Sequence, residues 1–276
     1  MARRLRYRRR STRASGGGAA WAAVFMIVVF AVVALMRQAQ IGGIGVAAKS
    51  PLPTSTIETV SDTVRLGAQD YYAIQFGVYE NSQAAQEKAQ EYVERGAAGY
   101  IWQDGAKYRV LAAVYTSLDD AQTIKERLAS QGIDTYIYTI HHNTLEMRVS
   151  ASESQRALLS QAFAFIERAA REIGDISVSL DKQTMNAQEA EERMLLLRDE
   201  AQTYAQRAGT ELGGDENGVI EGVKRLLGVI SAQYENISAQ NSREALAMTA
   251  KIKYNYLEVL WNVGNFIESV LALSAA

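Results

Sequence analysis

The chain has 276 residues, of which 48% are hydrophobic, and its formal net charge is −2 at pH 7. It contains no cysteine and only two histidines, which excludes disulfides, thiolate chemistry and metal sites built from thiolates or several histidines. Charge is unevenly distributed: residues 1–18 carry seven arginines and no acid, whereas residues 70–276 carry 29 acidic and 19 basic side chains. This segregation predicts a chain built from parts with different roles.

An apolar run follows the arginines. Residues 19–36 contain no charged side chain, and a helix of that length spans roughly 27 Å, close to the ~30 Å hydrocarbon core of a bilayer. A cleaved signal peptide is the alternative, but its apolar region is usually only ~7–15 residues long. We therefore expect a transmembrane helix at 19–36 behind a basic tail at 1–18. The positive-inside rule places the tail in the cytoplasm and everything after Arg37 outside the cell membrane.

Residues 37–69 differ in composition from both neighbours. They hold both prolines of the chain, Pro51 and Pro53, together with a glycine cluster and scattered serine and threonine. This composition is typical of a tether rather than a core, so we expect a flexible linker.

Residues 70–141 contain one pattern written twice, with Tyr72 and Tyr108 at equivalent places. Each copy has a β-rich run, a polar helix cap, an Ala- and Gln-rich helix, a glycine suited to the helix end, and a second β-rich run. Asp104-Gly105 between the copies is a hairpin signal. The sequence therefore predicts an α+β fold: a ferredoxin-like βαββαβ domain with a four-stranded antiparallel sheet in strand order 4-1-3-2, helices on one face and the other face open.

Residues 146–276 have long stretches of helical periodicity and no proline. Four amphipathic stripes are centred near residues 159–173, 194–208, 219–237 and 246–271, and the second is expected to end at Gly209. Such stripes are typical of a helical, bundle-like domain whose apolar faces form a shared core.

Strand alternation predicts which side chains lie on the open face of the sheet. Aromatic side chains flank a polar centre there, and flat rings beside hydrogen-bonding groups suit a sugar chain or a stacked nucleic acid. The alternative is that these aromatics serve packing alone and that the C-terminal helices cover this face. The candidate residues are Gln75, Arg109, Leu111, Tyr100, Trp102, Tyr136 and Tyr138.

The stretches "YYAIQFGVY" at 71–79 and "YRVLAAVY" at 108–115 resemble the SPOR domain, a sporulation-related repeat. The resemblance covers about a quarter of the chain. It implies binding to peptidoglycan glycan strands stripped of stem peptides, at division septa or sporulation sites. Gln75 and Arg109 match family positions implicated in glycan binding. The chain departs from the family pattern at Val78, Lys107 and Ala113-Val114.

The sequence bears on four classes of function. The preferred one is a non-catalytic, membrane-anchored envelope protein that binds peptidoglycan glycan strands, with no cofactor. A nucleic-acid binder is disfavoured, because residues 70–140 carry ten acidic and six basic side chains. An interaction protein with a protein partner for the helical domain is the alternative. An enzyme lacks support, since the side chains of His141 and His142 point apart on an extended segment.

Overall fold

The computed structural model describes residues 60–212, 218–232 and 242–275. The predicted cytoplasmic tail, the transmembrane helix and most of the linker lie outside these residues. Every element below belongs to one compact unit, residues 57–276. Within the described ranges, no helix combines the length and the apolar character that crossing a membrane requires.

The repeat folds as the predicted βαββαβ unit. Its sheet is antiparallel with order β3-β4-β2-β5, which is the predicted order 4-1-3-2. Glycines with positive φ follow both helices, Gly96 at 83° and Gly132 at 77°, and Gly105 at 59° turns the hairpin. The elements are β2 (Gln69–Tyr79), α2 (Ser82–Val93), β3 (Tyr100–Asp104), β4 (Lys107–Tyr115), α3 (Leu118–Ser130) and β5 (Tyr136–His142).

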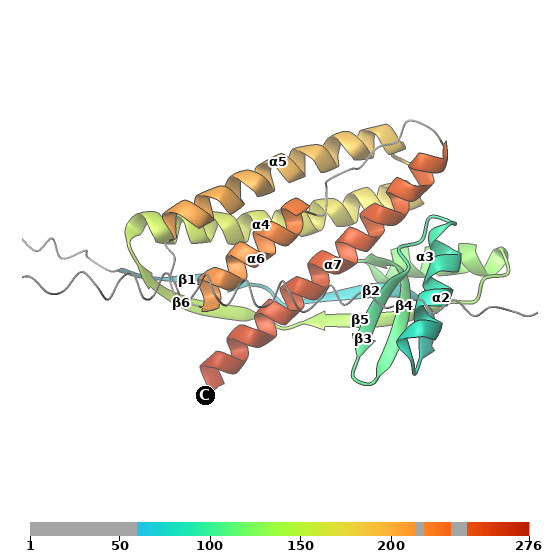
Figure 1. Cartoon of the computed structure of the whole chain (residues 1–276), viewed down its shortest axis with the longest axis horizontal. Coiled ribbons are helices and arrows are strands. Elements are labelled where there is room, and N and C mark those ends of the chain that lie inside the picture. Colours follow the sequence, from blue (N-terminus) through green and yellow to red (C-terminus); the bar gives the residue numbers. More distant parts are fainter. Residues whose placement is uncertain (1–59, 213–217, 233–241, 276) are drawn as a thin grey trace, which may run out of the picture. The chain divides into compact units, whose positions relative to one another are not determined.

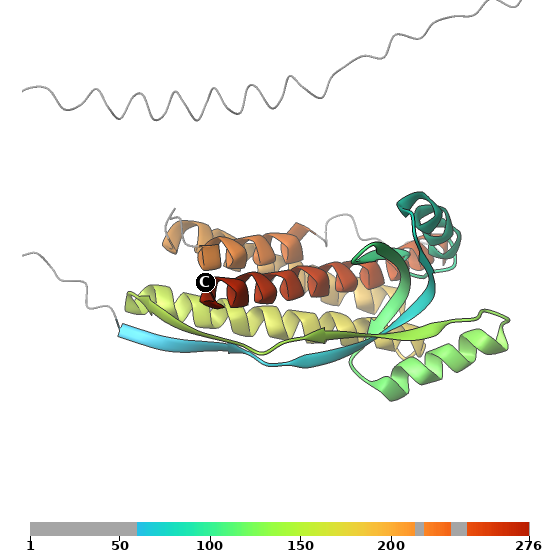
Figure 2. The same ribbon diagram turned by 90° about the horizontal axis from the view of Figure 1, so that it is seen from below.

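Two further strands form a separate two-stranded ribbon. β1 (Val60–Leu66) pairs antiparallel with β6 (Leu145–Ala151), from Val60 opposite Ala151 to Leu66 opposite Leu145. Figure 2 shows β1 leading into β2 and β5 leading into β6, with the ribbon running along α4.

The ribbon corrects two predicted boundaries. The linker prediction is wrong for residues 60–66 and for Gln69, and the helical domain does not begin at residue 146, because these residues lie in strands. These segments form strands because their apolar and polar side chains alternate. Every second side chain is thereby buried against α4 and its neighbours. The side chains buried in this way are Val64, Leu66, Leu145 and Met147, whereas Thr63, Arg65, Glu146 and Arg148 are exposed.

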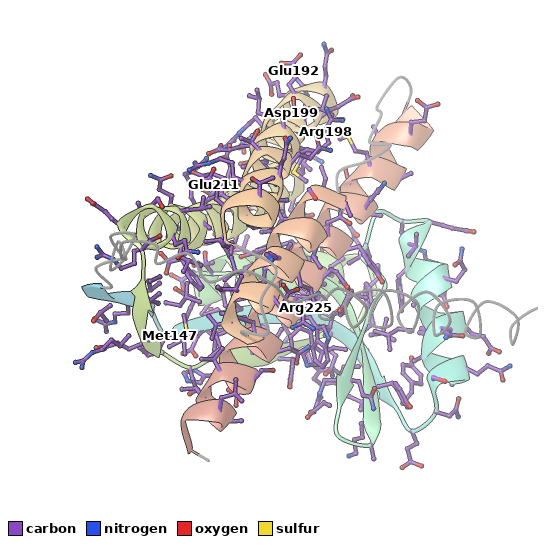
Figure 3. All side chains as sticks on the ribbon, turned by 60° about the vertical axis from the view of Figure 1, so that its left-hand side comes forward. Met147, Glu192, Arg198, Asp199, Glu211 and Arg225 are labelled. Carbon is purple, nitrogen blue, oxygen red and sulfur yellow. The ribbon has the colours of Figure 1, made fainter. Side chains whose placement is uncertain are left out.

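Four C-terminal helices form as predicted. They are α4 (Glu153–Asp181), α5 (Ala187–Glu211), α6 (Gly218–Ala232) and α7 (Ser242–Ala275). Capping boxes begin the first two, at Ser152 with Gln155 and at Asn186 with Glu189. α5 continues two residues past Gly209, where its end was expected. Figure 3 shows Glu192, Asp199 and Glu211 along the outer side of α5.

The helices cover the sheet face that was expected to be open. α7 crosses this face in Figure 1, and its Tyr254 and Trp261 rings meet Tyr100 and Trp102 edge-on, with ring centroids 4.9 and 4.7 Å apart. One continuous core joins this face to α4, α5, α6 and α7, while α2 and α3 enclose smaller cores on the opposite face. The open-face expectation is therefore wrong, and the alternative that the C-terminal helices cover this face is confirmed.

A buried ion pair ties the helical region to the repeat. Lys253 of α7 donates to Asp181 Oδ1 at the end of α4 over 2.7 Å and to the Gly96 carbonyl over 3.2 Å. The Tyr115 hydroxyl donates to Asp181 Oδ2 over 2.7 Å, and Arg127 donates to the Asp181 backbone carbonyl. The side chain of Asp181 thus connects α4 with α7 and β4. The backbone carbonyl of the same residue connects α4 with α3.

Candidate functional site

The predicted alternation of side chains across the sheet is confirmed. Ala73 and Leu111 pack in the core shared with α4 and α7, whereas Ile74 and Ala112 pack in the core beneath α3. The candidate residues therefore lie on the face where they were predicted, and what differs is how much of that face is exposed.

The covering helices divide the candidate residues into two groups. Gln75, Tyr100, Trp102 and Leu111 are buried, with exposed fractions of 7%, 6%, 8% and 0%. The two rings and Leu111 present no open flat surface and the Gln75 amide is shielded, so the predicted exposure of all four is wrong. Tyr136 remains 63% exposed and Tyr138 is half-buried.

Arg109 is the centre of the group that stays accessible. Its Nη1 donates to Gln75 Oε1 over 2.8 Å, while Nε and Nη2 donate to Asp104 Oδ2 over 2.9 and 2.6 Å. The guanidinium carbon lies 4.2 Å from the centroid of the Tyr138 ring. β2, β3, β4 and β5 each contribute one side chain to this group, which we call the Arg109 cluster: Gln75, Asp104, Arg109 and Tyr138.

The contacts of Arg109 fix its guanidinium group in one orientation. Three of its five N–H groups point at Gln75 and Asp104, so two are left to donate to a ligand. Burial, reinforced by the Asp104 carboxylate, raises the pKa of Tyr138, which keeps its hydroxyl protonated and able to donate. The cluster thus offers hydrogen-bond donors around a ring, an arrangement suited to the oxygens of a neutral polar ligand.

Asp104 was missed as a site residue by sequence reasoning. Its position directly before the hairpin glycine was attributed to turn formation alone. The register places Asp104 opposite Lys107, two positions along β4 from Arg109, and this pairing brings the carboxylate within reach of the guanidinium. In a tight hairpin, an acidic residue at the end of one strand lies near an arginine two positions along the other strand. This spacing can be found in a sequence and indicates an ion pair.

The two histidines point in opposite directions, as alternation predicts. His141 is exposed and its Nδ1 lies 2.6 Å from Asp70 Oδ1, whereas His142 is buried edge-on against the Tyr71 ring. The prediction of a surface strand end is therefore right for His141 and wrong for His142. In the part of the chain that the structure describes, no three His, Asp or Glu side chains come together to hold a metal ion.

Comparison with protein families identifies the fold. Residues 68–139 match the family model of the SPOR domain, and these residues are β2 to β5 of the structure almost end to end. The chain therefore contains a SPOR domain, as the strand motifs predicted. SPOR domains bind peptidoglycan, and their presence indicates a protein related to cell division. Comparisons with curated proteins and with solved structures found no match.

Proposed function

We propose that this chain is a non-catalytic envelope protein that is anchored in the cell membrane by residues 19–36 and binds peptidoglycan glycan strands outside the cell. The observation that supports this proposal best is the Arg109 cluster. Its Arg109 and Tyr138 side chains are half-buried and Asp104 is exposed within a SPOR domain, although Gln75, Tyr100, Trp102 and Leu111 on that sheet face are buried. The donors of Arg109 and Tyr138 would bind sugar oxygens, and the Arg109–Tyr138 stack would support a sugar ring.

Binding of the full chain to purified peptidoglycan tests this proposal. The comparison is between intact peptidoglycan and peptidoglycan treated with an amidase that removes the stem peptides. We expect stronger retention on the treated material and loss of most of that retention in the Gln75→Ala/Arg109→Ala double variant. Arg95→Ala is the matched control, because this arginine is exposed and follows α2, away from the Arg109 cluster. Equal retention of the double variant and the wild type would refute the assigned site.

One observation favours the alternative, an interaction protein that acts through its helices. The covering by α7 buries Tyr100, Trp102 and Leu111, so these side chains form no open stacking surface for a glycan. Imaging of a fluorescent fusion in the native cell separates the two functions. A septal or forespore pattern that depends on Arg109 supports glycan targeting. A pattern that persists in Arg109→Ala and is lost when the surface of α5 is altered supports a protein partner.

A further inference from the structure

A small pocket lies where α7 crosses the sheet, next to the Arg109 cluster. Its volume is about 150 Å³. β3, the end of β5 and α7 all contribute to it, so a SPOR domain without the helical region would not contain it. The residues that the argument uses are Trp102, His142, Asn143, Trp261, Asn265 and Glu268.

Trp102 connects the pocket with the cluster. It lies directly opposite Arg109 in the β3–β4 register, on the same face of the sheet. Its other side meets the Trp261 ring at an interplanar angle of 83°. The register therefore places this aromatic pair beside the Arg109 cluster.

The walls of the pocket combine apolar and polar groups. Trp102 and Trp261 form the apolar part. The polar part contains Asn143, whose Nδ2 donates to Glu268 Oε1 over 2.8 Å, and the exposed Asn265. The carboxylate of Glu268 disfavours an anionic ligand. A small uncharged group with one apolar end and one hydrogen-bonding end fits these walls best.

We propose that this pocket receives the acetamido group of an N-acetylated sugar, so that α7 completes the binding site of the SPOR domain. The inference rests on the proposed glycan binding. The acetamido methyl group packs against the indole rings, and its amide pairs with Asn265 and Glu268. A volume of about 150 Å³ is enough for this substituent.

Gly264 keeps the pocket open. A Cβ atom at this position would lie 3.0 Å from His142 Nε2, closer than most Cβ contacts. Glycine is a poor residue for a helix interior, and alanine is the best. Gly264→Ala therefore raises the helix propensity of α7 and also presses on the wall that His142 forms, and its melting temperature reports the net effect on folding.

The probe is chitotetraose, an oligomer of N-acetylglucosamine, and the comparison ligand is cellotetraose, which carries hydroxyls in place of the acetamido groups. Binding to the purified full chain is followed by tryptophan fluorescence, since Trp102 and Trp261 are two of the three tryptophans. We expect chitotetraose to bind about tenfold tighter than cellotetraose. Asn265→Ala should weaken it about fivefold, the effect of losing about one hydrogen bond, and Gly264→Ala should weaken it by a similar factor because its methyl group presses on the pocket wall.

Two control variants match the test variants. Asn262→Ala changes another asparagine of α7. Its Nδ2 donates to the Glu258 carbonyl of the same helix, and it does not line the pocket. Gly228→Ala changes a glycine in the interior of α6 that has open space around it. Both controls should bind chitotetraose like the wild type, and a cooperative melting transition in each variant shows that it is folded.

The possible outcomes separate this inference from the proposed function. Similar affinity for both tetrasaccharides, absence of chitotetraose binding, or wild-type affinity in both test variants overturns the pocket assignment. Glycan binding by the Arg109 cluster still stands in those cases if the chain binds stripped peptidoglycan and Gln75→Ala/Arg109→Ala does not. If the wild type binds neither peptidoglycan nor chitotetraose, both proposals are wrong.

Discussion

The buried His142 should make the folded state sensitive to mild acid. Its exposed fraction is 5%, its Nε2 has no hydrogen-bond partner in the described structure, and the Tyr71 ring packs on it with centroids 5.0 Å apart. Burial, reinforced by the neighbouring His141, lowers the pKa of His142 from 6.5 to about 4, and Glu268 opposes this shift only in part. His142 is therefore neutral in the folded chain at neutral pH.

The pKa of His142 differs between the folded and the unfolded chain, and this difference sets the sign and size of the change in stability with pH. Because the folded pKa lies below the unfolded pKa, the unfolded chain gains a proton first as the pH falls, and the folded state loses stability. Stability is complete above about pH 6.5 and is lost progressively toward pH 4. For a pKa of 6.5 unfolded and about 4 folded, the loss amounts to about 2 kcal/mol at pH 5.

Urea unfolding at pH 7 and pH 5 measures this loss. His142→Phe keeps a ring beside Tyr71 and removes the titrating group, so its loss between the two pH values should be about 2 kcal/mol smaller than that of the wild type. His141→Gln removes only the smaller contribution of the neighbouring imidazole, so its loss should be slightly smaller than that of the wild type and larger than that of His142→Phe. An equal pH dependence of His142→Phe and the wild type would refute the reasoning.

The remaining predictions concern packing and the buried ion pair. Asp181→Ala leaves the Lys253 cation buried without its carboxylate and should cost about 3–5 kcal/mol in urea unfolding, whereas Lys253→Met leaves Asp181 with other partners and should cost less than half as much. Gly222→Ala should lower the melting temperature, with a cost of about 1–3 kcal/mol, since its Cβ would lie 2.5 Å from the Phe266 ring. Gly228→Ala meets nothing within 4 Å and should gain about 0.5–1 kcal/mol by the same measurement. Reversed signs for these two glycines would contradict the packing of α6 on α7.

The order of elements in the SPOR domain could be predicted because short sequence signals encode it. The caps, the glycines with positive φ and the Asp104-Gly105 hairpin are encoded within a few residues, so the order of elements and of strands followed from the sequence. The β1–β6 ribbon was missed for a different reason. The alternation of residues 145–149 is visible in the sequence, but β1 is stabilised as a strand by a partner at the far end of the domain.

The covering of the sheet could not be derived from the strands themselves. Tyr100 and Trp102 show the same alternation whether they face water or another element, so strand pattern cannot separate a binding face from a packing face. A complementary signal does exist in α7. Tyr254 and Trp261 are two helical turns apart and thus share one side of the helix, which is the side that meets the two strand aromatics.

This covering has a consequence for how the SPOR domain functions in this chain. Burial of side chains such as Tyr100, Trp102 and Leu111 contributes on the order of 1.5–3 kcal/mol each, so α7 and the sheet stabilise one another across a shared core. The isolated domain would expose these side chains and gain an apolar surface that the full chain does not have. Glycan binding by the fragment would then include contacts that are absent from the intact protein. Binding measurements should therefore use the full chain. The glycan selectivity of the full chain should be examined first at the Arg109 cluster, because this cluster does not depend on uncovering that surface.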